Sequence, residues 1–157
     1  SHFIRLKMNH SLCQRPAVPL IPYLDKNVLL TKGFSLQEIL AGGEKYAAIQ
    51  SEMTASFSLT IRMERRYLAF GYSLQANPVL RSSDVRLTVE VECNRKKHTI
   101  FQTSASVPQT FQGENREYRL LDLTRFEGQI ITLIFSSENH GQEKGVSTLW
   151  LSPILTD

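Results

Sequence analysis

Cysteine is scarce in this sequence, and its two copies, Cys13 and Cys93, lie far apart. Neither belongs to a Cys-x-x-Cys or a short Cys/His pattern, so the spacing indicates neither a zinc site nor a dithiol redox motif. Cys93 continues the apolar phase of a strand-like run and is predicted to be a small core residue. A Cys13–Cys93 disulfide in an oxidising compartment stays open at this point.

Long apolar runs and low-complexity segments are also missing. No stretch approaches the roughly 20 apolar residues of a membrane span, so we expect no direct membrane insertion. Six prolines and eight glycines are too few for a collagen-like chain, and a hydrophobic content of 41% is too high for a disordered one. With 157 residues, a single globular domain can bury a sufficient core without metal or disulfide support.

Charge of one sign does not dominate, because the sequence has 18 Lys and Arg residues and 15 Asp and Glu residues, for a net charge of +3. The dense basic groups are Arg62 with Arg65 and Arg66, and the run Arg95-Lys96-Lys97. That run lies between two strand-like segments and is typical of a solvated hairpin tip. Without a basic face along one element, we expect no nucleic-acid partner.

The first 27 residues differ in pattern from the remainder. Residues 4–8 alternate apolar and polar side chains, which predicts an edge strand, and Pro16, Pro19 and Pro22 then recur at every third position. We therefore interpret residues 1–27 as an edge strand and a proline-rich strap packed on a domain of residues 28–157.

A single short helix is expected within that domain. Ser35 and Glu38 have the spacing of a capping box, and Gly42-Gly43 follows as a stop signal. This combination predicts a helix over residues 36–41.

The rest of the chain alternates with period two. Apolar phases run through residues 57–61, 68–74 and 85–93, and further strand-like runs cover residues 98–103, 118–121, 130–136 and 146–151. Turn signals separate these runs, and no repeat of fixed period is present. The fold class is therefore predicted to be all-β, an antiparallel β-sandwich of jelly-roll topology with one short helix.

The most specific segment begins at Asp122-Leu123-Thr124 and ends at Pro153. Thr124 and Glu127 have capping-box spacing for one helical turn, Phe126 is placed to plug the end of the sandwich, and Gly128 can take the positive φ that reverses the chain. The strand that follows places Ile131, Leu133 and Phe135 on one face, and a last strand carries Trp150.

This arrangement resembles the C-terminal third of galactose-binding-like jelly-roll modules, including carbohydrate-binding modules. The match is confined mainly to residues 118–154 and covers packing positions, so no sugar-contacting residue carries over. It implies a non-catalytic, carbohydrate-binding accessory module of a larger extracytoplasmic or membrane-anchored bacterial protein. A structural, protein-interaction or capsid-type assembly domain without a small-molecule site is the open alternative.

A glycan site needs an exposed aromatic ring beside groups that hydrogen-bond hydroxyls. The strand phase places Trp150 and Tyr72 in the core and Tyr67 outside it. If the three central strands are neighbours, one outer face would carry the predicted ligand-binding set: Arg62, Tyr67, Arg86, Thr88 and Glu90.

Other chemistries have little support in the sequence. No Gly-x-Ser-x-Gly nucleophile motif occurs, and Glu90 with Glu92 on one exposed strand face is a weak basis for glycoside hydrolysis. We therefore predict no enzyme and no cofactor. A structural calcium where the chain ends meet would draw on acidic candidates, although no Asp-rich loop supports it: Asp25, Glu138, Glu143 and Asp157.

Overall fold

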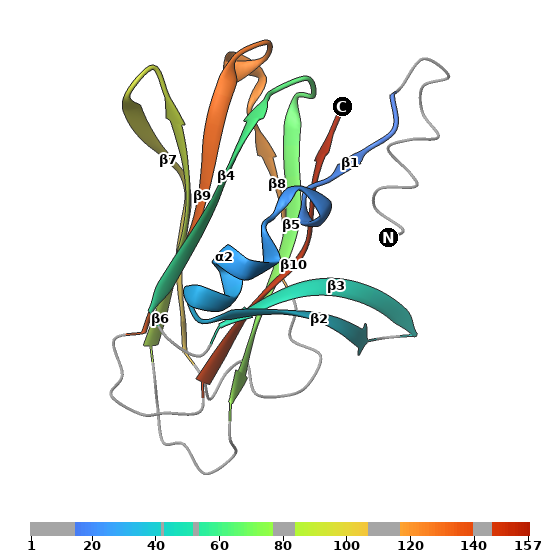
Figure 1. Ribbon diagram of the computed structural model, residues 1–157, viewed down its shortest axis with the longest axis vertical. Coiled ribbons are helices and arrows are strands. Elements are labelled where there is room, and N and C mark those ends of the chain that lie inside the picture. The colour runs from blue at the N-terminus through green and yellow to red at the C-terminus, as the bar shows by residue number, and fades with distance from the viewer. Residues whose placement is uncertain (1–14, 42, 52–53, 77–83, 107–116, 140–145) are drawn as a thin grey trace.

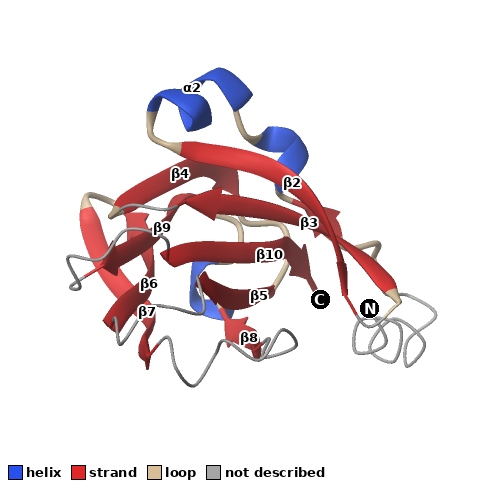
Figure 2. Cartoon of the chain, turned by 90° about the horizontal axis from the view of Figure 1, so that it is seen from below, coloured by secondary structure: helices blue, strands red, loops and turns tan. Residues whose placement is uncertain are grey.

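The computed structural model describes residues 15–41, 43–51, 54–76, 84–106, 117–139 and 146–157, and these form a β-sandwich. The two layers and the short helices at their edges are visible in Figures 1 and 2. The elements, in chain order, are β1 (Val18–Pro19), η1 (Ile21–Tyr23), α2 (Lys26–Thr31), β2 (Phe34–Ala41), β3 (Glu44–Ser51), β4 (Ala55–Arg62), β5 (Tyr67–Ala76), β6 (Asp84–Cys93), β7 (Lys96–Ser106), β8 (Glu117–Asp122), η2 (Thr124–Phe126), β9 (Ile130–Asn139) and β10 (Val146–Thr156). The predicted all-β, jelly-roll-type sandwich is confirmed.

The strands are divided between two antiparallel sheets. Sheet A has the order β2-β3-β10-β5-β8, with the short β1 pairing on β10, and sheet B has the order β4-β9-β6-β7. Strands that follow one another in the chain therefore often lie in different layers. Among the residues that the structure describes, no helix has the length and apolar character needed to cross a membrane.

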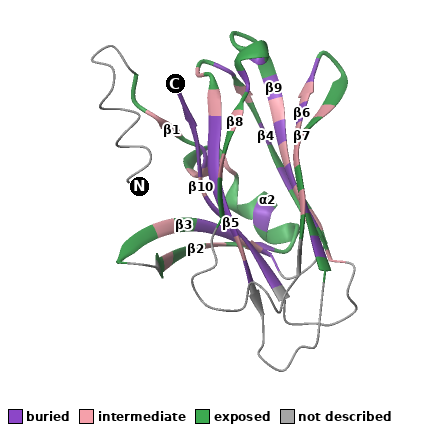
Figure 3. Cartoon of the chain, turned by 180° about the vertical axis from the view of Figure 1, so that it is seen from behind, coloured by how far each residue is buried: buried purple, intermediate pink, exposed green. Residues whose placement is uncertain are grey.

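The core lies between the sheets and is filled by the predicted apolar phases. Phe135 of β9 stacks on Phe57 of β4 with ring centroids 4.9 Å apart, and Trp150 of β10 meets Phe135 edge-on at 5.2 Å. Trp150 is fully buried, and the alternation of buried and half-buried residues along β9 is visible in Figure 3. The prediction that Trp150 and Tyr72 belong to the core is confirmed.

The expected helix over residues 36–41 is wrong. Those residues belong to β2, which pairs with β3 so that Ala41 lies opposite Glu44. The Ser35/Glu38 spacing is therefore coincidental, and the Gly42-Gly43 sequence, of the kind that two-residue hairpin turns prefer, follows a strand and not a helix. The helix forms earlier, at α2, where Asp25 Oδ1 accepts hydrogen bonds from the backbone N–H groups of Asn27 and Val28, at 2.9 and 3.3 Å.

The segment around η2 follows its prediction closely. Phe126 is buried at the end of the sandwich, and Gly128 has a φ of 82°. The capping of this turn differs from the expectation. The Thr124 backbone N–H donates to Asp122 Oδ1 at 2.9 Å, and the Thr124 side chain is not the cap.

The proline-rich segment lies along the last strand. Val18 and Pro19 pair with Leu155 and Ile154, and the Leu20 N–H donates to Pro153 O at 2.9 Å. Arg15 binds the Asp157 carboxylate through two hydrogen bonds of 2.9 and 2.8 Å. The predicted edge strand over residues 4–8 lies outside the described residues.

Candidate functional site

The five predicted ligand-binding residues do not form one cluster. Arg62, Arg86, Thr88 and Glu90 lie on the outer face of sheet B, whereas Tyr67 belongs to β5 in sheet A. The sequence expectation required β5 to neighbour β4 and β6. It neighbours β10 and β8 instead, and this juxtaposition is wrong.

The four residues on sheet B are themselves spread along β9. Arg62 pairs with Ile130 at one end, and Arg86 pairs with Glu138 at the other, a separation of roughly 27 Å at strand rise. The Arg62 guanidinium donates to Gly128 O at 3.0 Å, and Arg86 lies 4.0 Å from Glu138. Thr88 and Glu90 lie between them, so only Arg86, Thr88 and Glu90 are successive neighbours on this face.

The calcium candidates are likewise engaged elsewhere. Asp157 is held by Arg15, Asp25 caps α2, and Glu138 faces Arg86. Glu143 lies outside the described residues, and within the described ranges no group of three His, Cys, Asp or Glu side chains could hold a metal ion. Cys93 is a free, buried thiol that donates to Gln129 Oε1 at 2.8 Å, and Cys13 is not described.

The outer face of sheet A has a character that the sequence analysis missed. Ala48, Leu149 and Leu151 point away from the main core and are nevertheless 0%, 2% and 1% exposed. Tyr46 and Ile39 pack against them. We call the surface formed by Tyr46, Ala48, Gly71, Tyr118 and Leu151 the tyrosine face.

The rings of Tyr46 and Tyr118 meet on the tyrosine face. Tyr46 is on β3 and Tyr118 is on β8, three strand spacings or about 14 Å apart in a flat sheet. Their ring centroids are only 6.2 Å apart, with a tilt of 38°. The two side chains therefore lean toward one another over the intervening strands β10 and β5. The β2–β3 hairpin extends beyond the rest of the sandwich in Figure 1.

A glycine makes room for one of the rings. Gly71 of β5 lies directly opposite Tyr118, and a Cβ built on it would be 2.9 Å from Tyr118 Cε1. The Tyr118 ring thus rests against bare backbone while 46% of the residue stays exposed. An aromatic ring supported from below and open above is the geometry that stacking on a ligand requires.

Polar groups surround the two rings. The Tyr46 hydroxyl donates to Glu44 Oε2 at 3.0 Å, and Gln50 Nε2 donates to Ser147 Oγ at 3.0 Å on the same face. The hydrogen bond with Tyr118, burial and the Glu44 carboxylate, in that order, raise the pKa of Tyr46 well above its usual value. Tyr46 therefore stays protonated at neutral pH.

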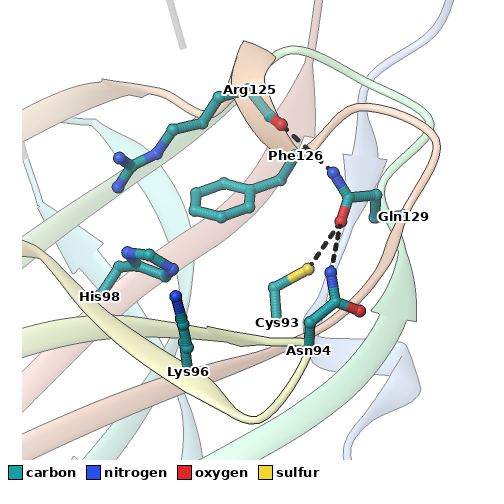
Figure 4. Close-up of a pocket in the computed structure, with 7 residues that line it drawn as sticks. All are labelled: Cys93, Asn94, Lys96, His98, Arg125, Phe126 and Gln129. Atoms are coloured by element: carbon teal, nitrogen blue, oxygen red, sulfur yellow. Dashed lines mark hydrogen bonds between the residues drawn. The ribbon is translucent and has the colours of Figure 1, made fainter.

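A pocket of about 260 Å³ lies at the end of sheet B (Figure 4). It is lined by residues from the β6–β7 turn and from the segment around η2: Cys93, Asn94, Lys96, His98, Arg125, Phe126 and Gln129.

Comparison with known proteins extends the description of the fold. Neither protein-family models nor curated proteins give a match to this chain. Among solved structures, the chain is similar to a carbohydrate-binding module of the β-sandwich superfamily with promiscuous specificity, at 12% identity and a TM-score of 0.45, over 80% of this chain and 57% of that chain. It is also similar to the mannan-recognising module TmCBM27, at 12% identity and a TM-score of 0.47, over 91% of this chain and 95% of that one.

A third similar structure is the CBM22-1 xylan-binding domain of Paenibacillus barcinonensis Xyn10C, at 12% identity and a TM-score of 0.44, over 79% of this chain and 81% of that chain. These structures belong to the class of module that residues 118–154 resemble. At this level of similarity they transfer no ligand and no binding residue to this chain.

Proposed function

We propose that this domain is a recognition module that binds a neutral oligosaccharide on the tyrosine face. The observation that carries the proposal is the Tyr118 ring, half exposed and resting on Gly71, beside Tyr46 at 6.2 Å. The apolar face of a pyranose stacks on such a ring, because its axial C–H groups meet the negative π-face.

The surroundings of the rings suit hydroxyl groups. Gln37 and Gln50 flank Ala48 on the same strand face, and Glu44 provides a carboxylate beside Tyr46. Amide and carboxylate groups in fixed positions can donate to and accept from sugar hydroxyls, which gives a binding site its orientation and specificity. A face that spans several strands accommodates a chain of sugars more readily than a single ring.

The resemblance of residues 118–154 supports the accessory part of the proposal. On that basis we place the module outside the cytoplasm, attached to or acting beside a larger protein. Protease accessibility of the full-length protein in intact cells would test this placement.

Binding is tested by calorimetry against soluble cello-, xylo-, manno- and galacto-oligosaccharides. We expect one series to bind and Tyr118→Ala to weaken that binding at least about tenfold, since a stacked aromatic is typical of residues that dominate an interface. Tyr23→Ala is the matched control, because Tyr23 is 63% exposed on η1, away from this face. Loss of affinity in both variants, or no binding by any series, contradicts the proposal.

An assembly role is the second candidate, and one observation favours it. Tyr23, Val28 and Leu30 of η1 and α2 are large apolar side chains that are 63%, 46% and 70% exposed. Exposed apolar side chains that gather on one surface often mark a protein interface. If no sugar binds while light scattering gives a defined oligomer that Leu30→Glu dissociates, the assembly role replaces the glycan role.

A further inference from the structure

The pocket at the end of sheet B lies in the other sheet from the tyrosine face and has a different chemistry. One wall is the β6–β7 turn, in which Asn94 and Arg95 have φ angles of 52° and 65°. Two left-handed residues in a two-residue connection form the tight turn that matches strand twist. This turn places Lys96 directly opposite Cys93.

Strand register then places two basic side chains, exposed Lys96 and half-buried His98, on the same face of sheet B as the core residues. Residues directly opposite one another in an antiparallel pair project to the same face of the sheet. Lys96 is paired with buried Cys93, and His98 with buried Val91, so both lie on the core side of sheet B, where apolar residues usually stand. Lys96 is exposed at this hairpin tip, as the sequence interpretation expected, and His98 is half-buried.

The opposite wall comes from η2. Phe126 is 4% exposed, and its ring lies 5.4 Å from the His98 ring. The Arg125 guanidinium lies over the same Phe126 ring at 4.7 Å, a cation–π contact that holds it at the pocket (Figure 4). The Phe126 ring is thus an apolar surface of the pocket that contacts both the Arg125 guanidinium and the His98 imidazole.

Gln129 joins the two walls and uses its own hydrogen-bonding groups to do so. Its Oε1 accepts from the Cys93 thiol at 2.8 Å and from Asn94 Nδ2 at 3.4 Å, and its Nε2 donates to Arg125 O at 3.4 Å. The groups that remain for a ligand include three sources of donors: the Lys96 ammonium, the Arg125 guanidinium and the His98 ring.

The positive charge in the pocket is not neutralised by the described part of the protein. None of the described lining residues is acidic. Of the ion pairs between described residues, none involves Lys96 or Arg125. Two cations that face a partly enclosed space without a carboxylate favour an anionic occupant, which gains charge-assisted hydrogen bonds from both.

We propose that this pocket binds the oxyanion group of a small ligand, a carboxylate or a phosphate, between Lys96 and Arg125 and above Phe126. Its volume of about 260 Å³ lies just below the roughly 300 to 1,000 Å³ of most small-molecule sites, which limits the occupant to a compact molecule. The proposal does not depend on glycan binding at the tyrosine face.

The test uses three probes on the intact domain: inorganic phosphate, glucuronate and, as the neutral counterpart of glucuronate, glucose. Amide chemical shifts followed by NMR report both affinity and location. We expect at least one anion to shift the amides of Asn94, Lys96, His98 and Gln129 and glucose to shift none of them. The anion that binds with the higher affinity shows whether the pocket prefers a phosphate or a carboxylate. Raising the salt from about 50 to about 500 mM weakens the binding, because partly exposed charges are screened.

Variants separate a built site from a general attraction to positive charge. The double variant Lys96→Gln/Arg125→Gln should weaken anion binding at least about tenfold. Lys97→Gln is the matched control, because Lys97 is on the same strand but pairs with Glu92 and projects to the outer face. We expect it to change the affinity by less than about twofold.

Three results overturn the proposal: neither anion shifts the pocket amides, glucose shifts them as strongly as glucuronate, or Lys97→Gln weakens binding as much as the double variant. Thermal unfolding of both variants shows whether the fold is retained. Because Gln129 and Phe126 are left in place, we expect both to stay folded. If the double variant does not fold, Arg125→Gln alone replaces it, and an unchanged affinity in that variant counts against the site.

Discussion

The substitution Gly71→Ala tests how the tyrosine face is built. The added Cβ would lie 2.9 Å from Tyr118 Cε1 and 3.1 Å from Leu151 Cβ. Leu151 Cβ is attached to the backbone of β10, which is hydrogen-bonded to β5, so it has little freedom to move. Restoring an ordinary carbon–carbon contact of about 3.5 to 4.0 Å therefore requires the Tyr118 ring to move by roughly 0.6 to 1.1 Å.

The fold should tolerate this change. Replacing a strand glycine by alanine gains about 0.5 to 1 kcal/mol of backbone entropy, whereas crowding costs about 1 to 3 kcal/mol. The net loss is small beside the roughly 5 to 15 kcal/mol that stabilises a domain of ordinary size. The main effect is thus local and falls on Tyr118 and its neighbour Tyr46.

Tyr46 reports the displacement without any ligand. Its hydrogen bond with Tyr118 is the largest cause of its raised pKa, ahead of burial and of Glu44. Moving Tyr118 should lower the pKa of Tyr46 toward the usual value of about 10. An absorbance titration of tyrosinate measures this, and Tyr46→Phe assigns the late-ionising group. Glycan affinity, where it is found, should fall in parallel.

Gly128→Ala is the control for this experiment. It also places alanine at a glycine, with a φ of 82°, but its Cβ would meet nothing within 4 Å. It should therefore cost stability through backbone strain and leave Tyr46 unaffected. A folded Gly71→Ala protein whose late-ionising tyrosine titrates as in the wild type would refute the idea that Gly71 supports the tyrosine pair.

Three further predictions concern the sandwich itself. Phe135→Ala removes a fully buried ring that contacts Phe57 and Trp150, and it should cost about 3 to 5 kcal/mol in urea unfolding; a loss below about 1 kcal/mol would contradict the described core. The emission of Trp150, the single tryptophan, should resist iodide quenching in the native state and lose this protection in urea; equal quenching in both states would show that it is exposed. Arg15 lowers the pKa of Asp157, so this pair stabilises the fold above the unfolded value of about 3.9, and the stabilisation is lost as pH falls through the lower folded-state pKa. The Tm difference between wild type and Asp157→Asn should accordingly shrink in acid, and a difference that grows would invert the argument.

Local alternation was sufficient to predict the core strands. In β6 and β9, every second residue is buried from Val85 to Cys93 and from Ile131 to Phe135, because one face of sheet B packs on the core and the other meets water. A period of two is then a direct record of burial. Strand phase also placed Trp150 in the core correctly, whereas Phe126 was located by the turn pattern of Thr124, Glu127 and Gly128.

The helix error shows where local signals compete. The Ser35-x-x-Glu38 capping pattern and the Gly42-Gly43 hairpin pattern occur in one segment, and the second prevailed. Pairing with β3 along its whole length gives β2 a neighbour that a six-residue helix would lack, since short helices are marginal without tertiary support. Asp25, with a true N-cap geometry, was the stronger helix signal.

The predicted grouping of Tyr67 with the residues of sheet B failed for a different reason. Period-two alternation predicts which face of its sheet a residue occupies, but not which strand lies next to it. Sheet B pairs β4 with β9 and β9 with β6, although these strands are widely separated in the chain. Strand order is set by long-range packing, and no local pattern in β4, β5 or β6 records it. Tyr67 was therefore grouped with residues of the other sheet.

One signal in the sequence does mark the tyrosine face, and it is the absence of alternation. Leu149-Trp150-Leu151 and Leu68-Ala69-Phe70-Gly71-Tyr72 are buried without interruption, as in strands that are covered on both faces. An antiparallel sheet with one solvated side would not produce such runs. Because only one face of each strand packs against sheet B, the second face must be covered by something else, and Tyr46 and Tyr118 contribute to that cover. The two strands whose pattern departs from simple alternation, β5 and β10, thus lie between the strands that carry Tyr46 and Tyr118.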